Sequence, residues 1–292
     1  MKKIGIVTDE VGDIDKEIAR KHKIAIASAK MDWPDIENLP GENTFQKMRE
    51  VEKRGIESFG KTSQPSPKNF LDCYKEQFKY FDEIICITVT SKLSGTFNSA
   101  IQARNMLGPE KSDKILVVDS LNATAGQALV VLKAVDSIEE SKDSKEVAEE
   151  LQGLIPKVRF FGILPDPKWL EKSGRMSSNL ANWVRKMAGI GIRPLIGIKS
   201  GVVKAVGVRT RVKDVPTALF KELEDQTKKS RKQGKRIRVV ITHGDDIKEA
   251  EKLKKMIEEG LENTEVAFLN LIDNVLGIIT GPGTLFCAWC EK

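Results

Sequence analysis

Apolar runs that alternate with helical patterns constrain the fold of the first half of this chain. Ile84 to Val89 and Ile115 to Val118 are apolar almost throughout, which is typical of strands covered on both faces of a parallel sheet. Thr96 to Leu107 and Gly126 to Ile138 carry apolar residues at helical spacing. Strands and helices that alternate in this order predict an α/β fold with a parallel sheet between two helical layers.

The second half has a different pattern. Ile192 to Ile198 and Val202 to Val208 flank Lys199-Ser200-Gly201, and two apolar runs joined by such a short polar turn predict an antiparallel hairpin. Other strand patterns lie at 158–164, 236–242 and 266–271, and helical patterns at 215–233 and 247–259. A hairpin among βα units predicts a mixed sheet.

The length of the chain predicts two domains. It has 292 residues, about twice the usual 150 or so of a single domain. We expect an N-terminal three-layer domain with a parallel sheet over residues 1–157. A smaller mixed-sheet α/β domain is expected over residues 158–292, and it stays open whether its tail packs back on the first domain.

Composition excludes several classes of protein. Hydrophobic residues make up 40% of the chain, which excludes a disordered chain, and the longest apolar runs are too short to span a membrane. The net charge is +6, but lysines are mixed with acids, as in Ser137 to Glu150. Without a dense Arg and Lys stripe, neither nucleic-acid binding nor stable membrane insertion is expected. The first apolar run ends at Asp9 after four residues, so we expect a cytoplasmic protein.

Cysteine and histidine are too few for most metal or catalytic sites. The chain contains four cysteines and two histidines, which do not make a disulfide framework or a histidine-rich metal site. No Gly-x-Ser-x-Gly elbow accompanies His22 or His243. We therefore expect no metal, no cofactor and no nucleophile with its base.

Gly55 to Thr62 matches the P-loop pattern G-x-x-x-x-G-K-[ST]. A functional P-loop follows a strand, and a helix begins at its Lys-Thr. Here a helical pattern precedes the motif, and Pro65 and Pro67 follow it, where they remove amide donors and interrupt a helix. The sequence favours a chance match, and a nucleotide-using enzyme is the alternative hypothesis.

A second candidate anion site lies in Thr88 to Thr96. It directly follows a buried strand and opens a helix, the place where open α/β sheets bind ligands. Helix amides favour an anion there, Ser94 and Thr96 add hydroxyls, and Gly95 allows close approach of the backbone. Simple helix capping is the competing interpretation. A second hydroxyl-rich segment at 62–66 favours anion binding without bond breaking.

In combination these segments resemble the DegV family, in order and over nearly the whole chain. The resemblance rests on Thr62-Ser-Gln-Pro-Ser-Pro67, Ser91-Lys-Leu-Ser-Gly-Thr96, Val118-Asp-Ser120, Leu170-Glu-Lys-Ser-Gly-Arg-Met-Ser177, Val208-Arg-Thr-Arg211 and Gly277-Ile-Ile-Thr-Gly-Pro-Gly283.

The resemblance implies a function. Family members are two-domain bacterial α/β proteins that bind one long-chain fatty acid between the domains. Several are the fatty-acid-binding subunit of a fatty acid kinase. A separate kinase subunit phosphorylates the carboxylate, and the acyl phosphate enters phospholipid synthesis. By this resemblance the chain is a lipid carrier with a possible kinase partner, and it is not itself an enzyme.

The resemblance also implies site residues. Those assigned to the lipid carboxylate are Thr62, Ser63, Ser94, Gly95 and Thr96. Those facing phosphate or the kinase are Arg175, Arg209 and Arg211. The turn at Ile279, Thr280 and Gly281 lines the pocket, and Ile279 stands where the family usually has His.

Overall fold

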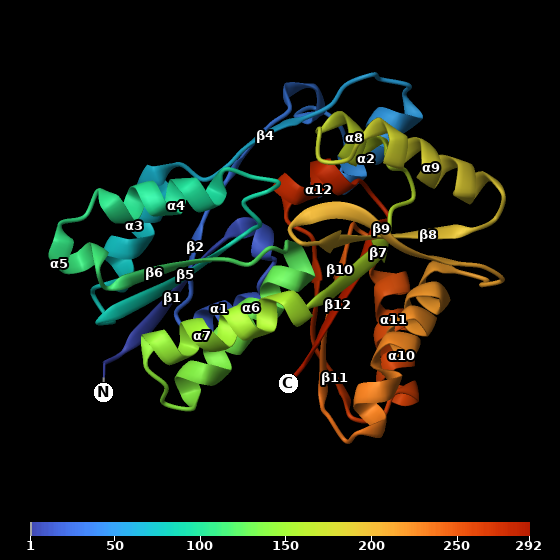
Figure 1. The fold of residues 1–292 in the computed structure, drawn as a ribbon. Helices are drawn as coiled ribbons and strands as arrows, with labels where there is room; N and C mark the ends of the chain where they lie inside the picture. Colours follow the sequence, from blue (N-terminus) through green and yellow to red (C-terminus); the bar gives the residue numbers. More distant parts are fainter. Residues whose placement is uncertain (1) are drawn as a thin grey trace. The chain divides into compact units, whose positions relative to one another are not determined.

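The computed structural model describes residues 2–292. It contains two main β-sheets (Figure 1). The chain groups into two compact units. Unit 1 contains the residues through Lys30, Ser63–Val158 and Ser200–Val202, and unit 2 contains Met31–Thr62, Arg159–Lys199 and Val203–Lys292. Residues 31–62, expected in the N-terminal domain, thus belong to the unit formed mainly by the later part of the chain. The division into domains of 1–157 and 158–292 stays a prediction.

Unit 1 contains the expected parallel sheet. Its strand order is β2-β1-β5-β6, and all three pairs are parallel, with Val7 opposite Cys86 and Ile87 opposite Val118. The strands are β1 (Ile4–Asp9), β2 (Ala25–Ala27), β5 (Glu83–Thr88) and β6 (Ile115–Asp119). Every residue of β1 is buried, as expected of a strand covered on both faces.

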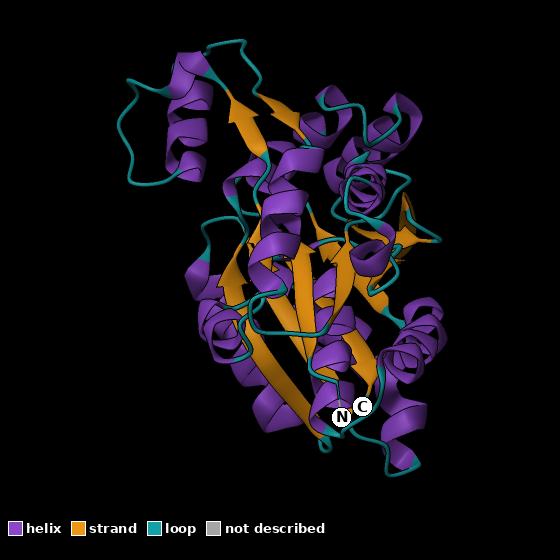
Figure 2. Ribbon diagram, turned by 90° about the vertical axis from the view of Figure 1, so that its left-hand side faces the viewer, coloured by secondary structure: helices purple, strands orange, loops and turns teal. Residues whose placement is uncertain are grey.

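Helices cover both faces of this sheet. Helices α3 (Pro67–Gln77) and α4 (Thr96–Asn105) lie on one face, and α6 (Thr124–Glu139) and α7 (Ser144–Leu154) on the other (Figure 1 and Figure 2). A capping box of Ser66 and Asn69 begins α3, and one of Asp143 and Glu146 begins α7. The shorter elements are η1 (Glu10–Gly12), α1 (Lys16–Lys21), α5 (Pro109–Ser112) and η3 (Ile155–Lys157).

Unit 2 contains a mixed sheet with the order β11-β10-β12-β7-β8-β9. Only β10 and β11 form a parallel pair among the strand pairs with described register. The strands are β7 (Arg159–Ile163), β8 (Arg193–Lys199), β9 (Val202–Arg209), β10 (Ile237–His243), β11 (Thr264–Leu271) and β12 (Leu285–Glu291). Ser200 and Gly201, both at positive φ, join β8 to β9, as in a tight hairpin turn.

This mixed sheet is larger than the sequence predicted, with six strands against four in unit 1. The difference comes mainly from β12, which pairs with both β10 and β7 and lies beyond the last strand pattern that the sequence indicates. Helices α10 (Val215–Lys232) and α11 (Ile247–Gly260) lie side by side on one face of the sheet (Figure 1). The other helices of this unit are α8 (Lys168–Lys172), α9 (Ser178–Gly189) and α12 (Asn274–Thr280).

Polar contacts attach residues 31–62 to the rest of unit 2. The chain enters this segment through β3 (Lys30–Asp32) and leaves it through β4 (Lys61–Ser63), which pair as a two-stranded sheet around η2 (Pro34–Ile36) and α2 (Thr44–Lys53). Asn43 Nδ2 donates to Asp245 Oδ1 at 2.8 Å, and Arg49 pairs with the same carboxylate. Thr44 Oγ1 bonds to Asn274 Oδ1 at 2.8 Å.

Within residues 2–292, none of the helices combines the length and the apolar character needed to cross a membrane.

The core beneath α11 gives a test of the fold. Leu253 is fully buried against the mixed sheet, whereas Ile247 on the same helix is 46% exposed. We expect Leu253→Ala to lower the free energy of unfolding by about 2–5 kcal/mol through lost transfer energy and a cavity. Ile247→Ala is the matched control and should change it by less than about 1 kcal/mol. Urea denaturation measures both, and equal losses would contradict this packing.

Candidate functional site

The loop after β5 places Ser94 at the beginning of α4, within unit 1. Gly95 is the N-cap residue of α4, and as a glycine it offers no side-chain cap. The Ser94 and Thr96 hydroxyls bond to each other at 2.7 Å, and the amide of Thr96 donates to Ser94 Oγ at 3.3 Å. Thr96 is only 1% exposed. Ser94 is therefore the hydroxyl that a ligand can reach, and Thr96 holds it in place.

Gln64 lies across Gly95. A Cβ at Gly95 would sit 2.4 Å from Gln64 Nε2, so a larger residue at this position would require the end of the Gln64 side chain to move. Gln64 Nε2 also donates to Ser99 Oγ on α4 at 3.4 Å. In the sequence, Gln64 lies within the hydroxyl-rich segment 62–66, where its residue type indicates no role of its own. Nothing in the spacing between residues 64 and 95 would have identified the contact.

A second candidate site lies in unit 2, where Arg175 contacts Thr62. Arg175 Nη2 donates to Thr62 Oγ1 at 3.4 Å, and its Nη1 donates to the carbonyl of Ser173 at 2.9 Å. Burial lowers the pKa of the Arg175 guanidinium. Among residues 2–292, no carboxylate forms a salt bridge with this half-buried cation. Such a charge is costly without an anion.

The predicted pocket turn lies at the end of α12. Ile279 is partly exposed, whereas Thr280 is buried and its hydroxyl donates to the carbonyl of Leu276 at 3.1 Å. Gly281 has φ 85°, and a Cβ there would lie 2.2 Å from Trp169 Cδ1 of α8. The turn therefore requires glycine at 281, and the Thr280 hydroxyl is already engaged.

Arg209 and Arg211 differ in their surroundings. Arg209 donates to Glu222 Oε2 and to Asp225 Oδ2, each at 2.7 Å, so two acids offset its charge. Arg211 is exposed and has φ 55°. Among the hydrogen bonds of the described residues, none links either arginine to the Thr62 or Ser94 site.

The P-loop match does not have P-loop geometry. Gly55 to Thr62 follows helix α2, and Lys61, Thr62 and Ser63 form strand β4 instead of opening a helix. Asp119, the carboxylate at the end of β6, accepts hydrogen bonds from the amides of Ser91 and Leu121. The structure thus lacks the strand, loop and helix that would hold a nucleotide phosphate. Among residues 2–292, no three His, Cys, Asp or Glu side chains are grouped to hold a metal ion.

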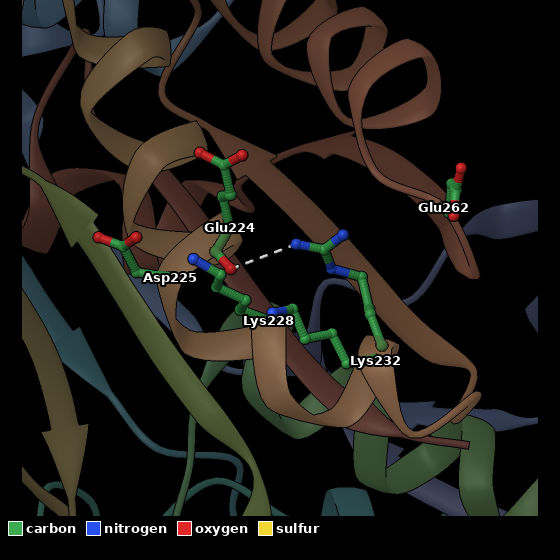
Figure 3. Close-up of a pocket in the computed structure, with 6 residues that line it drawn as sticks. Glu224, Asp225, Lys228, Lys232 and Glu262 are labelled. Carbon is green, nitrogen blue, oxygen red and sulfur yellow. Dashed lines mark hydrogen bonds between the residues drawn. The ribbon is translucent and has the colours of Figure 1, made fainter.

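A groove of about 380 Å³ on α10 is unsuited to an alkyl chain (Figure 3). It is lined by Glu224, Asp225, Lys228, Arg231, Lys232 and Glu262. Arg231 Nη2 donates to the Glu224 carbonyl at 3.3 Å, and Lys228 and Lys232 lie beside it. Because these side chains carry charges of both signs and none is apolar, this groove is not a lipid site.

Asp9 is an uncommonly buried carboxyl group at the end of β1. It is 1% exposed, and its Oδ2 accepts from the amide of Val89 at 2.7 Å and from Gln127 Nε2 at 3.2 Å. Burial is the main cause that raises the pKa of Asp9 to about 7, against these hydrogen bonds. The sequence reasoning used Asp9 only as the end of an apolar run.

Comparison with known proteins finds one family that matches almost the whole chain. The sequence model of a family described as "Uncharacterised protein, DegV family" matches residues 3–292. A DegV domain-containing protein of Clostridium acetobutylicum is 34% identical over 209 residues, which cover 69% of this chain and 70% of that protein.

Solved structures share the fold. A DegV family protein of Thermus thermophilus, described as fatty acid binding, has a TM-score of 0.80 at 23% identity and covers 99% of this chain and 100% of its own. A stearic-acid-binding protein of Eubacterium ventriosum has a TM-score of 0.80 at 23% identity, with 100% and 99% covered.

Asp9 predicts a pH dependence of stability. Its pKa is about 7 in the folded protein against an ordinary value of 3.8, so between these values the folded state keeps a proton that the unfolded state has lost. The free energy of unfolding should therefore fall as pH rises through this range, by up to about 1.4 kcal/mol per pH unit, and level off above pH 7 or so. Asp9→Asn should lack this contribution.

Urea denaturation at several pH values between 5 and 8 measures the effect. Asp113 is exposed, so Asp113→Asn should follow the wild-type curve. Identical pH slopes for the wild type and Asp9→Asn would show that Asp9 does not titrate in this way.

Proposed function

Because this chain belongs to the DegV family, we propose that it binds one long-chain fatty acid and holds the acid's carboxylate with Ser94, Thr62 and Arg175. The observation that carries the proposal is the half-buried Arg175 guanidinium, which bonds to the Thr62 hydroxyl and has no carboxylate partner among the described residues. A fatty-acid carboxylate supplies the missing charge. The stearic-acid-binding protein of Eubacterium ventriosum, which shares the fold, supports this ligand class.

Apolar burial supplies most of the affinity in this proposal. A chain of roughly 15 methylenes at ~0.8 kcal/mol each gives about 12 kcal/mol of gross transfer energy. Frozen torsions and lost overall motion reduce that figure. The carboxylate must then meet donors, since an unpaired buried charge costs several kcal/mol. The Ser94 hydroxyl, the amides in the first turn of α4 and Arg175 are such donors.

The remaining predicted residues take supporting roles. Thr96 orients Ser94, and Gly95 keeps the backbone close to the ligand beneath Gln64. Ser63, exposed beside Thr62 on β4, adds a hydroxyl. We further propose that the carboxylate is presented to a separate fatty acid kinase. Arg211 is exposed and makes no ion pair within residues 2–292, so it suits that surface better than Arg209, which pairs with two acids.

The head-group residues can be tested by retention of stearic acid. Arg175→Gln should weaken binding about tenfold or more, since a hydrogen bond to a charged group is worth about 1.5–3 kcal/mol. Thr62→Ala combined with Ser94→Ala should weaken it similarly, without loss of the folded state. Isothermal titration of delipidated protein measures the dissociation constant, and circular dichroism confirms folding.

Arg54→Gln is the matched control for Arg175. Arg54 lies in unit 2 just after α2, where it pairs with Glu50 and is half exposed. It should leave stearic-acid affinity unchanged. Unchanged affinity in Arg175→Gln and in the double variant would contradict the assigned head-group site, and a wild type without any uptake would contradict the lipid function.

The kinase step has its own test. Protein loaded with stearic acid should give acyl phosphate, trapped as the hydroxamate, only when a bacterial fatty acid kinase subunit and MgATP are both added. Ile279→His restores a polar group at the end of α12, so we expect a higher initial rate at unchanged lipid affinity. Acyl phosphate formed by the chain with MgATP alone would contradict the carrier role.

A further inference from the structure

Two carboxylates hold the loop that carries Ser94. Asp9, at the end of β1, accepts from the amide of Val89 at 2.7 Å. Asp119, at the end of β6, accepts from the amide of Ser91 with both oxygens at 3.2 Å. Since β1 and β6 flank β5 in the sheet, the loop that leaves β5 is fixed from both sides.

Backbone hydrogen bonds connect this anchored part of the loop to Ser94. Thr90, between the two anchored amides, donates its own amide to the carbonyl of Asn122 at 2.8 Å. The carbonyl of Thr90 then accepts from the amides of Leu93 at 3.2 Å and Ser94 at 3.3 Å. The position of Ser94 therefore follows from the anchored Thr90, all within unit 1.

The charge of these anchors is unexpected beside an anion site. A carboxylate near a bound carboxylate repels it, so Asp119, and Asp9 when it is ionised, weaken ligand binding by direct electrostatics. Their hydrogen bonds offer a reason for their presence, because each accepts a loop amide that otherwise lacks an acceptor at the sheet edge. Asp119 Oδ1 also accepts from the amide of Leu121 at 3.0 Å, which fixes the next loop.

We propose that Asp9 and Asp119 are positioning residues for ligand binding, which hold the loop from Val89 to Ser94 so that the Ser94 hydroxyl and the start of α4 meet the fatty-acid carboxylate. This inference rests on the proposed function and extends it to two residues that do not contact the ligand. It predicts opposite signs for the two effects of Asp119: loss of its charge favours anion binding, whereas loss of its hydrogen bonds opposes it. The positioning effect is the larger.

The test compares Asp119→Ala, Asp119→Asn and the control Asp113→Ala. Asp113 is an exposed acid of the same unit, with no side-chain hydrogen bond to the loop. Stearic acid is titrated into delipidated protein, and amide hydrogen exchange is followed in the peptides that cover residues 88–97 and 117–126. We expect Asp119→Ala to weaken binding about tenfold and to speed exchange at Ser91 and Leu121.

Asp119→Asn keeps one acceptor oxygen in the same shape, so we expect a smaller loss of affinity and partial protection of the Ser91 amide. It also keeps the test valid where Asp119→Ala does not fold. Asp113→Ala should match the wild type in both measurements.

The outcomes separate this inference from the proposed function. Wild-type protein that takes up no stearic acid contradicts the proposed function and the inference with it. Wild-type protein that binds, together with Asp119 variants that bind equally or more tightly, overturns the inference alone, because the carboxylate then acts only as a repelling charge.

Discussion

The cost of burying a charged group without a partner of opposite charge explains one feature in each unit. Arg175 holds a partly desolvated guanidinium that has only a hydroxyl and a carbonyl as partners. Asp9 holds a buried carboxyl group that receives an amide and a side-chain NH group but no cation. In the proposed function, the carboxylate of the fatty acid completes the first arrangement. The second is relieved by taking up a proton, which the raised pKa of Asp9 reflects.

The sequence predicted the parts of the fold that depend on local pattern. Continuous apolar runs correctly indicated β5 and β6 as strands covered on both faces, and the turn at Ser200 and Gly201 correctly indicated the β8–β9 hairpin. The prolines after Lys61 correctly argued against a P-loop. In each case the residues that determine the local structure are neighbours in sequence, so this structure can be predicted without knowledge of the fold.

Features that depend on contacts between residues far apart in the chain could not be predicted from the sequence. Strand β12 has no alternation that separates it from a buried tail, and its central place arises from pairing with β10 and β7. Residues 31–62 join unit 2 through Asp245 and Asn274, more than 190 residues away in sequence. Family motifs named Thr62, Ser94 and Arg175, but only the structure shows that Arg175 bonds to Thr62 and that Gln64 lies over Gly95.

The position of β12 has a consequence for synthesis. It is the last strand of unit 2 in chain order, yet it lies between β10 and β7 and pairs with both. While the ribosome makes the chain, β7 and β10 must therefore wait with unpaired edges until residues 285–291 emerge, and such edges favour aggregation. The parallel sheet of unit 1 has all its strands by residue 119. We therefore expect unit 1 to fold while translation continues, and unit 2 to depend on chaperones until its central strand arrives.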